Sequence, residues 1–381
     1  MIAIKKNKLL ILSLIDLLAL PRLPGLAIPI SLLPILVLVL IDKNKHRKTN
    51  LIAFFLLSLF VFLSVANGAL QQSQGVMLDN LKRGLQLISM FGYYFYFKQR
   101  AIEPEKITLL LRAFFIWVFI FLIAFTFRPV NYEFIVGGFF RETEEFLSKN
   151  ISNMRFPFIF SDPNSAGYLI AMCAAFYIKI ERNVKWLALV SIIGFVSIYA
   201  TQSRGAILGT FMILLAFCLD VIRMKRLGVA EGLTLVALLI FVSAIIWQEF
   251  GSTLIEVADN YSARMDSEDD FGGGRMDKYK YMFENLNFLP IGIGYEITMN
   301  GLLFRPHSDL IRWNFSYGLL SLPFLIILML PRSGGILIFI VALIPFLVNS
   351  LIDDYRLFAT YLILYPLAQS LNFKSAKSGK I

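Results

Sequence analysis

The sequence predicts an all-α, polytopic membrane protein with about twelve transmembrane helices, arranged as a single transmembrane domain over residues 1–381. Hydrophobic residues make up 57% of the chain, and long apolar runs recur along its whole length. Only 16% of the residues are charged, compared with about 25% in a typical soluble domain. Because this much apolar surface exceeds what a soluble core can bury, we expect lipid to cover it.

Each predicted span is a hydrophobic run, and a helix needs about 20 residues to cross a bilayer. The first run is short and contains Asp16, and the fourth carries Lys82 and Arg83 near its start. A basic segment precedes the first run, but a second run follows at once, which favours an anchor over a cleaved signal peptide. The runs cover residues 9–20, 24–41, 51–69, 77–97, 107–127, 164–180, 185–201, 204–221, 229–248, 308–330, 334–350 and 355–371.

Lysine and arginine residues predict how these spans are oriented. They are concentrated in alternate short loops, such as 42–48 and 222–226, and are nearly absent from the short loops between them. By the positive-inside rule, both termini lie in the cytoplasm. Two long loops, 128–163 and a main loop 249–307 that contains short helices, then face the outside. Loops of this length are usually functional in a compact protein.

Composition excludes several classes of function. Cys173 and Cys218 both lie inside apolar runs, so we expect neither a disulfide nor a metal pair. The net charge of +10 is scattered between hydrophobic runs and does not indicate nucleic-acid binding. The acidic segment 266–270 lacks the spaced ligands that would complete a metal shell. We therefore predict no metal and no cofactor.

Arg204 lies where one apolar run ends and the next begins, on the predicted outer side. One interpretation is an arginine that reaches the lipid interface with its charged end. The other is an arginine directed into an outward cavity to bind an anion, because ionisable residues within membranes are often functional. Gly205 and Gly209 would let a neighbouring backbone or ligand approach closely.

Arg275 follows three glycines, residues 272–274, and begins a predicted helix, 275–285, that also carries Lys278. The glycines alone would be consistent with a hinge. A helix that starts on them, however, presents free N–H groups and the positive end of its dipole, which favours an oxyanion or a phosphate.

His307 is one of only two histidines in the chain, and it lies beside Arg305 at the start of a predicted helix. On that helix His307 and Asn314 share a face, so both could line one cavity. An imidazole that is neutral near pH 7 can take a proton from a sugar hydroxyl, although a lone histidine is more often structural.

Asp162 and Asn164 close the first long loop in an Asp-Pro-Asn sequence. Such a sequence is typical of a turn and a helix N-cap, which is a sufficient reason for both residues. A role in lining the substrate site is the alternative.

These motifs, taken in order, resemble the O-antigen ligase/polymerase superfamily of bacterial membrane glycosyltransferases. The resemblance covers about residues 160–350. It rests on Ser203-Arg204-Gly205-Ala206, the Arg275 helix, Pro290-x-Gly292-x-Gly294-Tyr295, and His307-Ser308-x-Leu310 with Tyr317-Gly318-Leu319-Leu320. A serine follows His307 where the family more often has asparagine.

The resemblance implies a GT-C-like helical fold in the bacterial inner membrane, with an active site that faces the periplasm. The donor would be an undecaprenyl-diphosphate-linked oligosaccharide, and the acceptor a growing glycan or lipid A core. Membrane lipid and a chain-length regulator protein would be further partners. Arg204 and Arg275 match the family's diphosphate-binding arginines, and His307 its catalytic base.

The residues independently fit these roles. Guanidinium groups stabilise a diphosphate leaving group without metal, and His307 is the best candidate for the base. We therefore expect a metal-independent glycosyltransferase that polymerises surface-polysaccharide repeat units or, alternatively, transfers the glycan to lipid A core. Arg305, Asn314, Lys278, Asp162 and Asn164 would bind substrate. A transporter or flippase is a distant alternative, because no internal repeat is visible.

Overall fold

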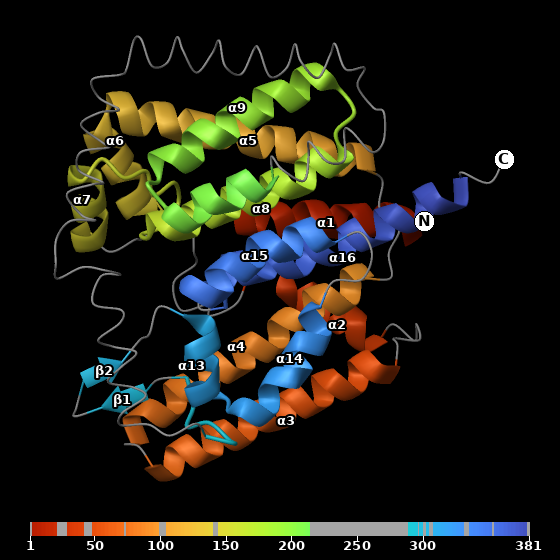
Figure 1. Ribbon diagram of the computed structural model, residues 1–381, viewed down its shortest axis with the longest axis vertical. Coiled ribbons are helices and arrows are strands. Elements are labelled where there is room, and N and C mark those ends of the chain that lie inside the picture. Colours follow the sequence, from red (N-terminus) through yellow and green to blue (C-terminus); the bar gives the residue numbers. More distant parts are fainter. Residues whose placement is uncertain are drawn as a thin grey trace. The chain divides into compact units, whose positions relative to one another are not determined.

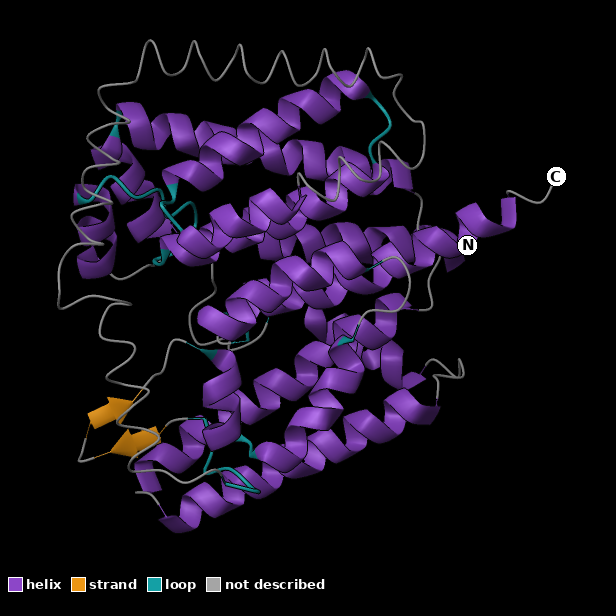
Figure 2. Cartoon of the chain, in the orientation of Figure 1, coloured by secondary structure: helices purple, strands orange, loops and turns teal. Residues whose placement is uncertain are grey.

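The computed structural model describes residues 2–20, 29–41, 48–71, 74–98, 104–139, 144–213, 289–295, 297–299, 302–304, 308–330, 335–352 and 354–378. They belong to one compact unit, formed by Met1–Ile213 with Phe288–Ile381. Figure 2 shows that this part of the chain is helical apart from one small sheet. The predicted run 229–248 and most of the predicted main loop, 249–307, lie outside the described residues.

The hydrophobic runs predict the described helices closely (Figure 1). Two helices, Lys48–Leu70 and Pro104–Phe127, are long and apolar enough to cross a membrane, and a bent pair of helices would make a third. The predicted number of twelve spans is therefore not confirmed within the described residues. The helices that match the runs are α1 (Ile2–Leu18), α2 (Leu32–Ile41), α3 (Lys48–Gln71), α4 (Gln74–Lys98), α5 (Pro104–Phe127), α8 (Pro163–Ile180), α9 (Val184–Ala200), the helix Arg204–Ile213, α15 (Ile336–Val348) and α16 (Tyr355–Ser378).

The predicted loops contain secondary structure of their own. Within 128–163 lie α6 (Pro129–Phe134), a π-helix (Ile135–Phe139) and α7 (Glu144–Ser152). Within 249–307 lie two short antiparallel strands, β1 (Ile297–Met299) and β2 (Leu302–Phe304), which pair Thr298 with Leu303. The prediction of an all-α chain is thus correct for the scaffold but misses this hairpin.

The predicted span 308–330 is broken in the structure. It consists of α13 (Asp309–Ser316), a 3₁₀ turn (Leu319–Ser321) and α14 (Leu322–Met329), with a bend of 112° between the two halves. Gly318 adopts a φ of 82° at the bend, a conformation that glycine takes without steric cost. The Trp313 indole donates to Ser321 Oγ at 2.7 Å, and Ser321 Oγ donates to the Gly318 carbonyl, which fixes the bend.

Large aromatic side chains hold the helices together. α4 packs against α2, α3 and α16, while α8 packs against α9, α15 and α16. At the α4–α16 contact, Phe91 meets Phe358 edge-on and Tyr94 stacks on Tyr365. Such pairs add about 0.5–1.5 kcal/mol beyond the burial of their area.

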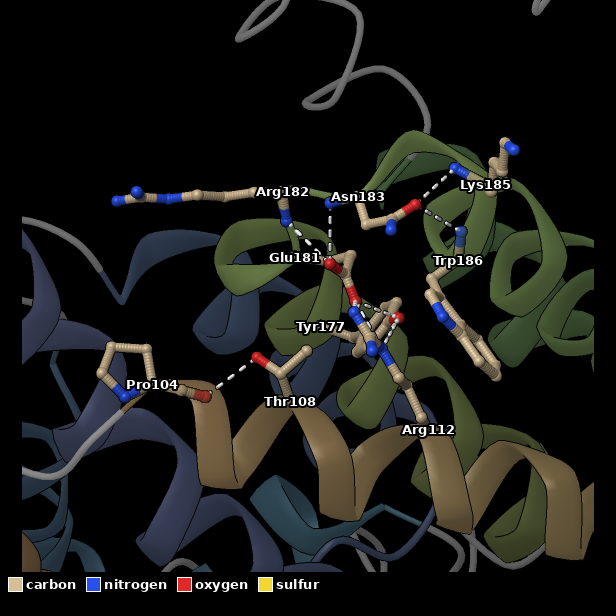
Figure 3. Close-up of polar contacts among 9 residues, drawn as sticks. All are labelled: Pro104, Thr108, Arg112, Tyr177, Glu181, Arg182, Asn183, Lys185 and Trp186. Carbon is tan, nitrogen blue, oxygen red and sulfur yellow. Dashed lines mark hydrogen bonds and ion pairs between the residues drawn. The ribbon is translucent and has the colours of Figure 1, made fainter.

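A partly buried ion pair joins α5, α8 and the start of α9 (Figure 3). Arg112 of α5 donates to Glu181, at the C-terminal end of α8, through Nη2 at 2.7 Å and Nε at 2.8 Å. Tyr177 and the backbone N–H groups of Arg182 and Asn183 also donate to this carboxylate. The Arg112 guanidinium lies 4.8 Å from the centre of the Trp186 ring, which secures α9.

At the opposite end of α5, an aromatic cluster anchors the segment that leads into α8. Phe156 and Phe158 are fully buried, and the Phe156 ring contacts Phe125, Tyr132 and Phe158. The Tyr132 hydroxyl donates to the Phe158 carbonyl at 2.5 Å. This packing explains why so many aromatic residues occur in the predicted loop, and it fixes the position of the neighbouring Arg155.

Candidate functional site

The structure describes four of the eight predicted site residues. Asp162, Asn164, Arg204 and Asn314 are described. The other four, Arg275, Lys278, Arg305 and His307, lie outside the described residues. The prediction that Arg204, Arg275 and His307 serve one active site therefore stays a prediction.

The first cluster of polar residues lies at the N-terminal end of α8. Asp162 is the N-cap of this helix, and its carboxylate accepts from the Asn164 backbone N–H at 3.0 Å. The same oxygen accepts from the Asn164 side-chain amide at 2.9 Å. The capping role that the Asp-Pro-Asn sequence predicts is thus confirmed, and it orients the Asn164 side chain.

Arg155 joins this end of α8 to the turn after α9, a role that the sequence did not reveal. Its Nη2 donates to Asn164 Oδ1 at 3.3 Å, and its Nε donates to the Thr201 carbonyl at 3.4 Å. The one signal available in the sequence was an arginine in a loop on the predicted outer side, where the positive-inside rule disfavours cations.

Arg204 begins the helix Arg204–Ile213, directly after this turn. Ser203 lies before it and accepts from the Ala206 N–H at 3.4 Å, as an N-cap does. The Arg204 side chain is exposed. Because Thr201 accepts from Arg155, the turn that carries Arg204 is tied to the Asn164 end of α8.

Backbone strain is concentrated in the same place. Among the described non-glycine residues, positive φ angles occur only at Met154, Phe158 and Gln202, with values of 53°, 51° and 52°. The Gln202 side chain donates to the Met154 carbonyl at 3.3 Å, which couples two of them. Such residues cost on the order of 1–3 kcal/mol each and tend to cluster at functional sites.

Two glycines allow these segments to lie close together. A Cβ atom on Gly167 of α8 would come within 3.0 Å of Ala206 and Thr201. A Cβ atom on Gly205 would overlap the Tyr168 hydroxyl. Gly205 does permit a close approach, but the approaching group is the side chain of Tyr168 and not a backbone segment or a ligand.

The second cluster is built on the segment Leu289–Tyr295, which contains the Pro-x-Gly-x-Gly-Tyr motif. The Gly292 N–H donates to Ser64 Oγ at 3.1 Å, and its carbonyl accepts from Asn67 at 3.0 Å, both on α3. The N–H groups of Ile293 and Gly294 donate to the last turn of α13 at 2.9 Å. The segment is therefore fixed between α3 and α13.

Asn314 lies on α13 beside this segment. Its side chain is 8% exposed, and its Oδ1 atom has no hydrogen-bond partner among the described residues. The helix starts at Asp309, with Ser308 as its N-cap, and not at His307 as predicted. Serine caps a helix well because its hydroxyl can accept a free N–H, here that of Ile311. Because α13 does not include His307, the predicted face shared by His307 and Asn314 is not a face of this helix.

One helix supports both clusters. α15 packs against α8 and against α13. At its C-terminal end, the Asn349 carbonyl accepts from the Asp309 N–H at 3.1 Å, and Asp309 in turn accepts from Leu351 and Ile352. The described part of the site therefore consists of guanidinium, amide and hydroxyl groups at helix ends, a set of groups that suits anionic and sugar ligands.

The apolar helices indicate a helical membrane protein, and the polar helix ends are its candidate site for polar ligands. Residues 189–322 match the family model of O-antigen ligase. The match confirms the predicted resemblance to the O-antigen ligase/polymerase superfamily. Among the predicted site residues, Arg204, Arg275, Lys278, Arg305, His307 and Asn314 fall within the matched segment, and Asp162 and Asn164 precede it. A search of curated proteins finds no match to the chain.

Proposed function

We propose that this protein is a metal-independent membrane glycosyltransferase that uses an undecaprenyl-diphosphate-linked glycan as its donor. The observation that carries this proposal is the O-antigen ligase match over residues 189–322, which includes the predicted diphosphate-binding arginines and the predicted base. The lipid tail of such a donor would stay in the bilayer while its sugar enters the site from the outer side.

In the proposed reaction, an acceptor hydroxyl attacks the anomeric carbon of the donor sugar. His307 takes the hydroxyl proton, a new glycosidic bond forms, and the bond between the sugar and the diphosphate breaks. Arg204 and Arg275 stabilise the negative charge that develops on the leaving diphosphate. Asp162, Asn164, Lys278, Arg305 and Asn314 bind the substrates.

Polymerisation of surface-polysaccharide repeat units is the reaction we favour. His307-Ser308 and the short segment between Tyr295 and His307 depart from the commoner family pattern, and these departures bear on the acceptor more than on the transfer chemistry. The description of the matching family favours a second candidate, transfer of the glycan to lipid A core. The two reactions share the donor and differ in the acceptor. Either one would take place at the periplasmic face of the inner membrane, with both termini in the cytoplasm and, for a polymerase, a chain-length regulator as a partner.

The test uses purified full-length protein in detergent or liposomes with a lipid-diphosphate-linked oligosaccharide. A polymerase lengthens the glycan on the lipid without any other acceptor, whereas a ligase gives product only when lipid A core is added. Substrate that crosses a liposome membrane unchanged would instead support a transporter. His307→Ala and Arg275→Ala should abolish product while the protein stays inserted. Near-normal product from His307→Ala would reject that residue as the base.

A further inference from the structure

Two arginines from different elements lie against the ring of Tyr295. Arg83 of α4 has its guanidinium carbon 4.9 Å from the ring centre, and Arg312 of α13 has its own at 3.8 Å. Both distances are in the range of cation–π contacts. Because hydrogen bonds to α3 and α13 fix the segment before Tyr295, the ring is held where both arginines reach it.

Among the described residues, both side chains that lie over this ring carry a positive charge. The Arg83 side chain is half-buried and donates to the neutral amide of Gln86 at 3.1 Å, and it has no carboxylate partner among the described residues. Arg312 is 4% exposed and interacts electrostatically with Asp309, whose Oδ2 accepts from Leu351 and Ile352. Two guanidinium groups near the same ring repel each other, and a bound anion offsets that repulsion.

Buried polar atoms of Tyr295 and of α13 also form no hydrogen bond with the described residues. The Tyr295 hydroxyl, Asn314 Oδ1 and Ser316 Oγ form no hydrogen bond within the described part of the chain. Their residues are 6%, 8% and 1% exposed. Buried hydroxyl and amide groups are nearly always hydrogen-bonded, so unpaired ones call for an explanation such as a ligand. The two hydroxyls can donate to an oxygen of an anion.

We propose that Arg83, Tyr295 and Arg312 form a binding site for an anionic group, a carboxylate or a phosphate, carried by the glycan substrate. Guanidinium groups are planar donors that bind such groups through two hydrogen bonds. The identity of the ligand as a glycan rests on the proposed function. The consequence is a preference for acidic glycans over neutral ones.

The experiment measures anion binding to the full-length protein in detergent, without any lipid-linked donor. Glucuronate, inorganic phosphate and neutral glucose are titrated separately and followed by calorimetry and by the thermal unfolding midpoint. All measurements are made in the Arg204→Gln background, which removes one predicted diphosphate contact. We expect glucuronate or phosphate to bind and glucose not to bind, and the stronger of the two anions identifies the group.

Arg83→Gln should weaken anion binding by about 10- to 100-fold, the effect of losing a charge-assisted hydrogen bond. The anion affinity of Arg83→Lys should lie between those of the parent and Arg83→Gln, because lysine keeps the charge and loses the planar contact. Arg182→Gln is the matched control, since Arg182 is exposed and lies at the other end of α8. It should bind the anion like its parent.

Tyr295→Phe separates binding from structure. The hydroxyl that it removes has no described partner, so the variant should fold and unfold at a midpoint no lower than its parent's. Binding should nevertheless weaken. Unchanged binding in both Arg83→Gln and Tyr295→Phe, equal loss in Arg182→Gln, or no binding of either anion would each overturn the proposal. The binding experiment does not depend on glycan transfer. If the protein binds the anion but shows no glycosyltransferase activity, the proposed function is rejected and the anion site is not.

Discussion

At Gly292 two segments that are far apart in the sequence come into contact. A Cβ atom there would come within 3.0 Å of the Ser316 backbone, closer than side chains approach in folded proteins. Gly294, two residues on, has a φ of 94°, and a Cβ atom there would overlap Asn80. The glycines of the motif are therefore needed so that the segment fits between α3, α4 and α13.

We predict that Gly292→Ala lowers the free energy of unfolding by about 1–3 kcal/mol, because backbone atoms would have to move to make room. The matched control is Gly138→Ala, where the added carbon would meet nothing within 4 Å. Thermal unfolding of the two purified variants checks the prediction. Equal midpoints would show that the contact between Gly292 and Ser316 adapts without cost.

A substitution at Arg204 can distinguish the effect of its positive charge from that of its planar shape. If it binds a diphosphate through two parallel hydrogen bonds, Arg204→Lys should lower the rate of glycan transfer at least about tenfold, since an ammonium group cannot reproduce the planar contact. Initial rates with a lipid-diphosphate-linked oligosaccharide measure the effect. Arg182→Lys is the control and should transfer glycan at the normal rate. A normal rate from Arg204→Lys would show that the charge of Arg204 is sufficient and that its planar contact is not needed.

At the scale of the elements, Glu181 holds three helices together at one end (Figure 3). Burial raises the pKa of this carboxyl. Hydrogen bonds from Tyr177, the Asn183 backbone and Arg112, together with the charge of Arg112, lower the pKa by more than burial raises it. The pKa of Glu181 is therefore below its ordinary value. A carboxylate of this kind stabilises the fold above its unfolded-state pKa. That contribution is lost as the pH falls through the folded-state pKa.

Glu181→Gln should therefore lower the free energy of unfolding at neutral pH by about 1–3 kcal/mol, the range for hydrogen bonds to charged groups. Removing one partner of a fully buried ion pair would lower the free energy of unfolding by more. Here the effect is smaller, because the Arg112 side chain is 23% exposed. The difference in free energy of unfolding between Glu181→Gln and its parent should become smaller in acid, where Glu181 of the parent is protonated and loses its charge.

Unfolding midpoints at neutral and acidic pH test this prediction. The control is Asp79→Asn, which removes an ion pair with Lys82 whose partners are 61% and 57% exposed. It should change stability little, because exposed ion pairs contribute little. A Glu181→Gln midpoint that falls no further than that of Asp79→Asn would contradict the role given to Glu181.

Hydrophobic runs predicted most of the helices because length and apolarity are local properties. The run 51–69 corresponds to α3, and the run 107–127 to α5. The break in 308–330 was not predictable in this way, because the run is apolar on both sides of the bend. The bend depends on Gly318, whose neighbours Leu319 and Leu320 donate to Leu289 and Pro290.

The candidate site was predictable only in part, for the same reason. The capping role of Asp162 follows from three adjacent residues, so the sequence reveals it. The contact between Arg155 and Asn164 depends on the aromatic packing around Phe156 and Phe158. Arg83 reaches Tyr295 across more than 200 residues of sequence, and no local pattern indicates such a pairing.

For the whole molecule, the distribution of positive charge predicts which helix ends face the cytoplasm. The N-terminal end of α8 carries Asp162 and Asn164 and should face the outside, and the end at Glu181 should face the inside. α8 has 18 residues and is therefore about 27 Å long, close to the thickness of a hydrocarbon core. The predicted orientation places its two ends on opposite sides of the membrane.

Cysteine labelling in intact cells tests this orientation. Ser152 and Val184 are exposed residues near opposite ends of α8, and each is replaced by cysteine in a chain with Cys173→Ala and Cys218→Ala. A reagent that cannot cross the inner membrane should label Ser152→Cys in intact cells and Val184→Cys only after permeabilisation. The reverse pattern would turn the Arg204 end of the fold toward the cytoplasm, where a donor presented at the outer leaflet cannot reach it, and it would reject the proposed glycan transfer along with the orientation.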